Sequence, residues 1–280
     1  MARPVVCFSY LAAAELWHVE RFPLPNCGAG IGHVEASIAA DGPMTAAALA
    51  ALGVPAQLLS NGLGADEHGR MVSARLEAYG VRLAPGSTAA DGLPTPRITV
   101  VADDLNTRTW FSHLPGVGDA LAALDLAPLA SAAYAYIDCY QLIATPAVRA
   151  IRAARAASVP LLLNLGGSPL TSAVMSAVGS HPALAVQTNV GDADHADAAT
   201  VAASILAATA ADWAIVTAGA YGAVAVSRDQ HLFAPGFRVG VRHTHCAGAA
   251  FSGGLLYGLL HGWPIRDTLA SGFRLAAGPA

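Results

Sequence analysis

Asn61-Gly62-Leu63-Gly64-Ala65-Asp66-Glu67-His68-Gly69 is the part of the chain that says most about its architecture. An apolar run of strand length, 56–59, precedes it, and a segment of helical periodicity, 67–79, follows it and stops at Gly80. Asp66 suits the N-cap of that helix, and the glycines suit a tight turn. The run therefore predicts a strand, a turn and a helix in succession.

The same alternation of strand-length and helix-period segments extends along the whole chain. The expected core strands are 5–8, 56–59, 133–137, 161–163 and 213–216, and the expected helices are 44–52, 67–79, 147–156, 198–208 and 249–260, with Gly53, Gly80 and Gly262 as stops. This pattern predicts one α/β domain with a mostly parallel sheet and helices on both faces. Residues 11–35 and 94–113 break the rhythm and alternate as exposed strands do, so they predict a small β lid.

Composition excludes several classes of partner. Hydrophobic residues make up 54% of the 280 residues, but no apolar run reaches the ~18 residues of a membrane span. The apolar part of the N-terminus is too short for a secretory signal, so the cytoplasm is expected. The 15 basic residues are all arginine and are scattered, which argues against nucleic acid. The absence of lysine excludes Schiff-base chemistry, and the unpaired spacing of the four cysteines predicts reduced thiols.

Four motifs resemble those of the ribokinase-like, or PfkB-type, carbohydrate kinases. The run 61–69, with Leu76 and Gly80-Val81, is similar to their Gly-x-x-Gly-x-Asp-x-x-Gly…Leu…Gly-Val signature. Thr217-Ala218-Gly219-Ala220-Tyr221-Gly222-Ala223 resembles their Thr-x-Gly-x-x-Gly turn, Asn189-Val190-Gly191-Asp192 resembles Asn-x-x-Glu, and the run 243–251 resembles Asp-Thr-x-Gly-Ala-Gly-Asp-x-Phe. The motifs follow the order of the family along nearly the whole chain. The resemblance implies a Rossmann-like α/β core with a small β lid.

The last motif departs from the family where its chemistry takes place. It reads His243-Thr244-His245-Cys246-Ala247-Gly248-Ala249-Ala250-Phe251, and Ala249 occupies the position of the aspartate that deprotonates the attacking hydroxyl in the family. General-base catalysis contributes ~10²–10⁴-fold, and a methyl group accepts no proton. Cys246, Ala247 and Gly248 would still present amides as an anion hole at a helix start near Ala249. The resemblance therefore implies a kinase fold without efficient phosphoryl transfer.

The sugar-binding positions of the family are altered as well. Its early aspartate corresponds to Ala14, and its Gly-Gly-x-x-x-Asn element corresponds to residues 39–44, with Gly42 inside and Met44 in place of the asparagine. A sugar in such a pocket would leave hydroxyls unpaired at ~1–3 kcal/mol each, which favours a less polar small molecule.

Several other side chains are candidates for the same pocket. Asp138 ends a core strand at the edge where such sheets bind ligands. Asp41 is either a pocket acid or the N-cap of the helix from Met44, and the cap is favoured. Trp110, with Trp17 and Phe111, would line the inner face of the lid, form the core of that sheet or make a homodimer contact.

The nucleotide side keeps more of the family pattern. Asn189 and Asp192 could hold a hydrated Mg²⁺ and phosphates, and Thr217, Gly219 and Gly222 would lie beside the nucleotide, so ATP and Mg²⁺ are cofactors only if the chain is a kinase. In the family, segments after the last motif complete the adenine pocket. Because the sequence stops at Ala280 after one more helix-like stretch, part of the nucleotide wall is expected to be missing.

The remaining reactive groups are His243, His245 and Cys246. A histidine could act as acid or base near neutral pH, and Cys246 at a helix N-terminus is expected to have a lowered pKa. The two histidines would point the same way on a strand, but no third metal ligand is identifiable, so no metal is expected. The alternative is that all three are neutral replacements on a disused turn.

Three functions follow from these observations. The chain is a repurposed enzyme that acts on a small molecule, a non-catalytic binding or scaffold pseudokinase, or an active sugar or nucleoside kinase with an atypical acid.

Overall fold

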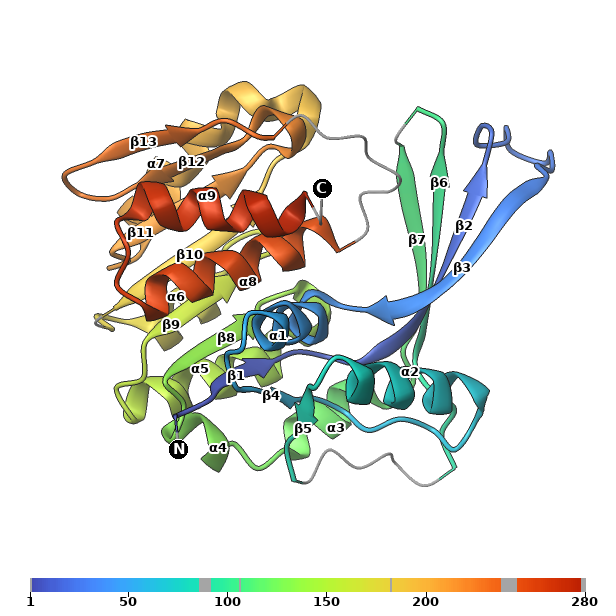
Figure 1. The fold of residues 1–280 in the computed structure, drawn as a ribbon, viewed down its shortest axis with the longest axis horizontal. Helices are drawn as coiled ribbons and strands as arrows, with labels where there is room; N and C mark the ends of the chain where they lie inside the picture. Colours follow the sequence, from blue (N-terminus) through green and yellow to red (C-terminus); the bar gives the residue numbers. More distant parts are fainter. Residues whose placement is uncertain (1, 86–91, 106, 182, 238–245, 278–280) are drawn as a thin grey trace.

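A computed structural model describes residues 2–85, 92–105, 107–181, 183–237 and 246–277 (Figure 1). The candidate residues His243 and His245 lie outside these ranges. Among the described residues, no helix is both long and apolar enough to cross a membrane.

The main sheet has nine strands in the described part of the chain, in the order β13-β12-β11-β10-β9-β8-β1-β4-β5. In chain order they are β1 (Val5–Phe8), β4 (Ala56–Leu59), β5 (Arg82–Leu83), β8 (Tyr134–Asp138), β9 (Leu161–Asn164), β10 (Leu184–Asn189), β11 (Trp213–Thr217), β12 (Ala223–Val226) and β13 (His231–Ala234). All neighbours from β5 to β11 pair in parallel, and only β12 and β13 are antiparallel. The predicted mostly parallel sheet is confirmed.

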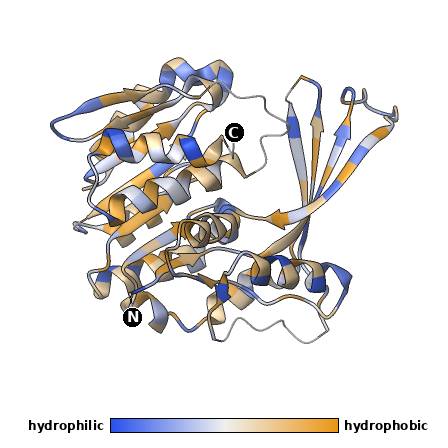
Figure 2. Ribbon diagram, viewed as in Figure 1, coloured by the Kyte–Doolittle hydropathy of each residue, from blue (hydrophilic) through white to orange (hydrophobic). Residues whose placement is uncertain are grey.

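Helices cover both faces of this sheet, with one apolar core beneath each group. One group is α1 (Asp41–Ala51), α2 (Glu67–Ala78), α8 (Ala247–Leu260) and α9 (Ile265–Ala276), and the other is α3 (Val117–Ala123), α4 (Ala127–Ala130), α5 (Ala144–Ala156), α6 (Ser172–Val178) and α7 (Ala198–Ala208). Alternate residues of one strand enter the two cores, since Val5 and Cys7 pack on one side and Val6 and Phe8 on the other. Figure 2 shows the hydrophobic colour concentrated along these strands.

The turns after three helices follow the sequence prediction. Gly53, Gly80 and Gly262 have φ angles of 77°, 72° and 65°, the left-handed conformation that ends a helix at little cost only when the residue is glycine.

A second sheet projects from the main one as the predicted lid. Its strands are β2 (Ala12–Val19), β3 (Ile31–Ala39), β6 (Arg97–Asp103) and β7 (Arg108–His113), in the order β3-β2-β6-β7. The register aligns Trp110 with Val100, Leu16 and Glu35, so these four side chains share one face. Trp110 and Phe111 are neighbours on β7, so they lie on opposite faces, and they are 63% and 66% exposed.

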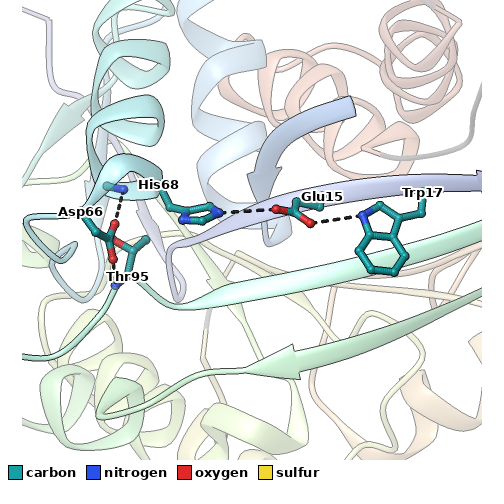
Figure 3. A network of polar contacts seen from close by, with 6 residues as sticks. Glu15, Trp17, Asp66, His68 and Thr95 are labelled. Atoms are coloured by element: carbon teal, nitrogen blue, oxygen red, sulfur yellow. Dashed lines mark hydrogen bonds and ion pairs between the residues drawn. The ribbon is translucent and has the colours of Figure 1, made fainter. Parts of the chain in front are cut away.

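The start of α2 is tied to the lid by the carboxylate of Asp66 (Figure 3). Asp66 is the N-cap that the sequence predicts, and it accepts hydrogen bonds from the backbone N of Gly69 (2.8 Å) and from the backbone N (2.8 Å) and hydroxyl (2.6 Å) of Thr95, just before β6. The Thr95 hydroxyl is the main cause that lowers the pKa of Asp66 to about 2. A Cβ on Gly69 would lie 2.0 Å from the Gly64 carbonyl oxygen, so glycine is required at this turn.

The next residues of α2 continue the contact with the lid. His68 Nε2 lies 3.5 Å from Glu15 Oε1, and Trp17 Nε1 donates to Glu15 Oε2 at 3.2 Å (Figure 3). Because Glu15 and Trp17 belong to β2, the first turn of α2 fixes the base of the lid.

Asp66→Ala is expected to lower the free energy of unfolding by ~2 kcal/mol, because a helix cap and two contacts to Thr95 are lost together. The folded pKa of about 2 lies below the ordinary value of 3.8, so this contribution is complete above about pH 4 and disappears as the pH falls through 2. Urea unfolding of the wild type, the variant and the control Glu67→Ala, from neutral to acid pH, measures it. Equal losses for Asp66→Ala and Glu67→Ala would contradict the prediction.

Candidate functional site

Polar side chains gather where three neighbouring strands of the main sheet end. Asp138 is the last residue of β8, Asn164 is the last of β9, and Ser9 follows β1 directly. These strands are parallel neighbours, so their carboxyl ends meet at one edge, where open α/β sheets bind ligands. The sequence placed Asp138 at this edge, and the structure confirms that position.

Asp138 is fully buried, and both of its carboxylate oxygens are occupied by donors. Oδ2 accepts from the Ser9 hydroxyl at 2.5 Å and from the backbone N of Gly42 at 2.9 Å. Oδ1 accepts from the Tyr136 hydroxyl and from Asn164 Nδ2, both at 2.8 Å. A Cβ on Gly42 would lie 2.3 Å from that of Ser9, so only glycine lets this amide approach the carboxylate.

Burial, and to a lesser extent the neighbouring negative charge of Asp41, raise the pKa of Asp138 from its ordinary value of 3.8 to about 7. The hydrogen bonds from Ser9, Asn164 and Tyr136 oppose this shift without cancelling it. Asp138 therefore gains or loses its proton near neutral pH.

The N-cap role predicted for Asp41 is wrong. Helix α1 begins at Asp41 itself rather than near Met44, and its N-cap is Ala40, which has a φ of 80° and no side-chain cap bond. The turn at Ala40 brings Asp41 to the sheet edge, where Oδ2 accepts from the Tyr140 hydroxyl at 2.5 Å and from Asn164 Nδ2 at 3.0 Å. The side chain of Asp41 therefore joins the polar side chains at the sheet edge instead of capping the helix.

We call this group of six residues the polar cluster: Ser9, Asp41, Tyr136, Asp138, Tyr140 and Asn164. Asn164 Nδ2 joins its two carboxylates, because it lies within 3.3 Å of oxygens of both and of the two tyrosine hydroxyls. In the described part of the chain, no group of three or more His, Cys, Asp or Glu side chains is arranged to hold a metal ion.

The start of α8 packs against the start of α1 (Figure 1). The Thr45 hydroxyl, one helical turn after Asp41 and on the same face, donates to the backbone oxygen of Ala249 at 3.1 Å. The side chain of Ala249 is fully buried. Ala249, which the resemblance of the run 243–251 aligned with the family's general base, therefore has a methyl side chain enclosed by protein.

The expectation of a lowered pKa at Cys246 is wrong as well. Cys246 is the N-cap of α8, with a φ of 65°, but burial and the negative charge of Asp41 raise the pKa of its thiol to about 12. Arg108 of the lid lowers it only in part, and Glu35 of the lid raises it. These effects outweigh the helix N-terminus, so Cys246 is a neutral thiol at physiological pH.

The predicted anion hole coincides with the first turn of α8. The helix begins at Ala247, two residues earlier than expected, so Ala247 and Gly248 contribute backbone N–H groups that the helix itself leaves unpaired. Gly248 is exposed and has no atom within 4 Å of a Cβ built on it. This turn therefore presents backbone amides that can bind an anion.

Three predicted substrate-binding positions are not members of the polar cluster. Ala14 is fully buried in the core beneath the lid. Met44 is half-buried against the core under α1, and Trp110 lies on β7 of the lid. Only Gly42 and Asp138 of the predicted substrate set belong to the sheet-edge site.

The predicted nucleotide-side residues lie together on neighbouring strands. Asn189 ends β10 and Thr217 ends β11, where the Thr217 hydroxyl donates to the Thr188 carbonyl at 3.4 Å. Asp192 begins the 3₁₀ turn η2 (Asp192–Asp197), and Gly219 begins the turn η3 (Gly219–Tyr221). The two turns approach closely, because a Cβ added to Gly219 would lie 2.2 Å from Oδ1 of Asp192. Gly222 has a φ of 110°, which favours glycine.

An aromatic contact joins the turns η2 and η3. The rings of His195 and Tyr221 stack with centroids 3.8 Å apart and planes 4° from parallel. The two turns are thus joined by a ring contact as well as by the approach of Asp192 to Gly219.

The sequence reasoning missed Ser9, Tyr136, Tyr140 and Asn164. Asn164 ends the apolar run Leu161-Leu162-Leu163 and could have been found by the rule that located Asp138. Tyr140 lies beyond its strand, and no local signal in the sequence directs its hydroxyl to Asp41.

Comparison with known proteins agrees with this architecture. The family model described as pfkB family carbohydrate kinase matches residues 41–278. The chain belongs to the PfkB family. No curated protein matches the chain in sequence.

Solved structures of PfkB-type proteins share the fold at low sequence identity. Ribokinase of Arabidopsis thaliana, complexed with ribose and ATP, superimposes with a TM-score of 0.75 at 17% identity, covering 99% of this chain and 92% of that one. A nucleoside kinase of Methanocaldococcus jannaschii, an archaeal member of the ribokinase family, gives 0.77 at 18% identity, covering 99% and 91%. Ribokinase of Cryptococcus neoformans var. grubii serotype A, in complex with ADP, gives 0.75 at 19% identity, covering 99% and 93%. The PfkB fold, with its core and lid, is thereby shown.

Proposed function

We propose that this PfkB protein binds a small molecule at the polar cluster and has lost efficient phosphoryl transfer. The observation that carries the proposal is at Ala249. Its methyl side chain is fully buried, and its backbone carbonyl accepts a hydrogen bond from the Thr45 hydroxyl. No carboxylate on α8 takes the place of the family base, since its described first turn contains only Ala247, Gly248, Ala249 and Ala250. Without a base, phosphoryl transfer is expected to be slower by ~10²–10⁴-fold.

The hydrogen bonding of the cluster supports a ligand less polar than a sugar. All four contacts of Asp138 are made by protein donors, so Asp138 positions its neighbours and has little capacity left for a ligand. Asp41 is half-buried, and its Oδ1 has no partner among the described residues. One free carboxylate oxygen suits a ligand with one or two donors rather than a ring of hydroxyls.

The pair of carboxylates also supports proton transfer on a bound ligand. Asn164 bridges Asp41 and Asp138, and the pKa of Asp138 is raised to about 7 by burial and by Asp41. Burial and the negative charge of Asp41 therefore favour the protonated form of Asp138. A ligand group that approaches Asp41 therefore meets a site able to give or take a proton.

A second candidate function is a kinase that uses Asp41 in place of the missing base. Asp41 and Thr45 lie on the same face of α1, Thr45 contacts Ala249, and the charge of Asp41 reaches Cys246 at the start of α8. Since positioning and electrostatics dominate phosphoryl transfer, a carboxylate on the neighbouring helix could accept the proton.

The two functions differ in their expected response to ATP. If the first proposal holds, ADP release from ATP with ribose or a nucleoside is expected to stay at background for both the wild type and Asp41→Asn. Calorimetry with ATP·Mg²⁺ is expected to show no micromolar binding. Glu67→Gln, a neutralised carboxylate on the surface of α2, is the control for a nonspecific effect of charge. Micromolar ATP binding together with turnover that Asp41→Asn abolishes would overturn the first proposal and establish the second.

A further inference from the structure

A surface hollow lies at the opposite end of the main sheet from the polar cluster. Trp213 begins β11, whereas Asp138 ends β8, and the strands from β8 to β11 are all parallel, so the two residues lie at opposite ends of the sheet. The hollow is open to solvent and has a volume of about 280 Å³. Its lining comes from β11, the β12–β13 hairpin, the end of α8 and the start of α9: Trp213, Gln230, Leu232, Leu259, Trp263, Pro264, Ile265 and Arg266.

The volume of this hollow distinguishes it from a smaller cavity beside Asn61 and Pro94. That cavity admits only about 20 Å³, room for a single water. The hollow at Trp263 approaches the lower end of the ~300–1,000 Å³ typical of small-molecule sites. Its size therefore suits a ligand of one or two fused rings.

One wall of the hollow is a tryptophan that is fixed in place while remaining 42% exposed. The ring of Trp263 meets that of Tyr257 edge-on, at 5.3 Å and 76°, and His261 lies 6.2 Å away. Its backbone N donates to the Gly258 carbonyl at 2.9 Å, directly after the left-handed turn at Gly262. A rigid, exposed indole loses little conformational freedom when another ring stacks on it.

The charge in the hollow is positive. Arg266 lines it and makes no ion pair or side-chain hydrogen bond with any described residue. Asp267 follows it in the first turn of α9 but is not part of the lining, and the other polar lining side chain, Gln230, is neutral. A guanidinium beside aromatic walls, without a carboxylate partner in the protein, suits an anionic group of a ligand.

We propose that this hollow binds a planar aromatic anion, with its ring against Trp213 and Trp263 and its acidic group on Arg266. The apolar side chains Leu232 and Leu259 exclude water from the ring, and the guanidinium offers two parallel N–H groups to a carboxylate. The site is separate from the polar cluster and does not depend on the function proposed for it.

Calorimetry with 2-naphthoate, and with the neutral 2-naphthamide as a matched probe, tests the proposal on the full-length protein. Saturable 1:1 binding of naphthoate is expected, and Arg266→Gln is expected to weaken it ~10-fold while changing naphthamide binding less than ~2-fold, because only the charged contact is lost. Trp263→Ala is expected to weaken both probes. The control variant Arg70→Gln, on the surface of α2, is expected to bind naphthoate as the wild type does.

Several results would overturn the assignment. Naphthoate that fails to saturate would show that the hollow is not a site of this class. A loss in Arg70→Gln equal to that in Arg266→Gln would show that net charge alone attracts the anion, and naphthoate binding that Trp263→Ala leaves unchanged would place the probe elsewhere on the protein. Thermal unfolding of each variant confirms that a loss of binding does not come from a loss of folding.

Discussion

Asp138→Ala is expected to lower the free energy of unfolding by ~3 kcal/mol, since it leaves several buried donors without an acceptor. The Ser9 hydroxyl, the Gly42 amide, the Tyr136 hydroxyl and Asn164 Nδ2 all point at this carboxylate. Removing the buried charge offsets part of the loss, which is why the expected value is below the sum of four unpaired groups. Urea unfolding at neutral pH measures the change.

Asp138→Asn is the matched variant, because it keeps the size of the side chain and one acceptor for the Gly42 amide. We expect it to cost ~1 kcal/mol, about one hydrogen bond. Its more informative property is the pH dependence. The folded pKa of about 7 lies above the ordinary value of 3.8, so the folded state binds a proton that the unfolded state has released. The stability due to Asp138 therefore falls as the pH rises from about 4 to 7 and is constant above and below that window.

The asparagine variant is expected to lose this downward slope, while groups with lowered pKa values, such as Asp66, keep their own dependence at acid pH. Unfolding curves of both proteins at intervals between about pH 4 and 8 compare the slopes. A variant that keeps the wild-type slope would show that Asp138 is not the group that titrates in this range.

The fold could be predicted from sequence because its signals are local and repeated. Strand-length apolar runs, the Asp66 cap and the glycine stops each act within a few residues, and the structure places them as predicted. The lid followed from alternation in the same way, although β3 runs on to Ala39. These features depend on the spacing of apolar residues, with a period of about 2 residues in strands and 3.6 in helices, which can be read directly from the sequence.

The site was less predictable because its geometry depends on distant segments. Asp41 matched a helix cap by composition, but the left-handed turn at Ala40 turns it toward Tyr140 and Asn164, about a hundred residues away in the chain. The pKa of Cys246 was expected to follow the helix N-terminus, whereas burial and Asp41 decide it. Neither the orientation of Asp41 nor the raised pKa of Cys246 is marked by a local sequence pattern. The effect of a single substitution on α8 on stability therefore depends also on α1.

Ala249→Asp is expected to lower the free energy of unfolding by ~3 kcal/mol and to leave phosphoryl transfer at background. The side chain at this position is fully buried, so a carboxylate there loses its hydration. Asp41 lies on the facing turn of α1, and its negative charge adds repulsion. Restoring the residue type of the family therefore does not restore its environment.

The control is Ala250→Asp, the next residue, which is half-buried. A carboxylate there stays in the first turn of α8, where the helix dipole favours it by ~0.5 kcal/mol, so a much smaller loss of stability is expected. Urea unfolding and ADP release with ATP·Mg²⁺ and ribose are measured for both variants. Turnover of ribose or a nucleoside by Ala249→Asp would contradict the argument that the surrounding site has changed together with the base.

Combining Ala249→Asp with Asp41→Asn separates the two causes of the expected loss. If repulsion from Asp41 is part of it, the double variant is expected to be ~0.5–1 kcal/mol more stable than the two single changes predict, since residues on facing turns couple. If the double variant is simply additive, burial alone accounts for the loss and Asp41 does not face the start of α8. That outcome would also remove the support for Asp41 as a substitute base, because a base that replaces the residue at position 249 must lie within reach of the first turn of α8.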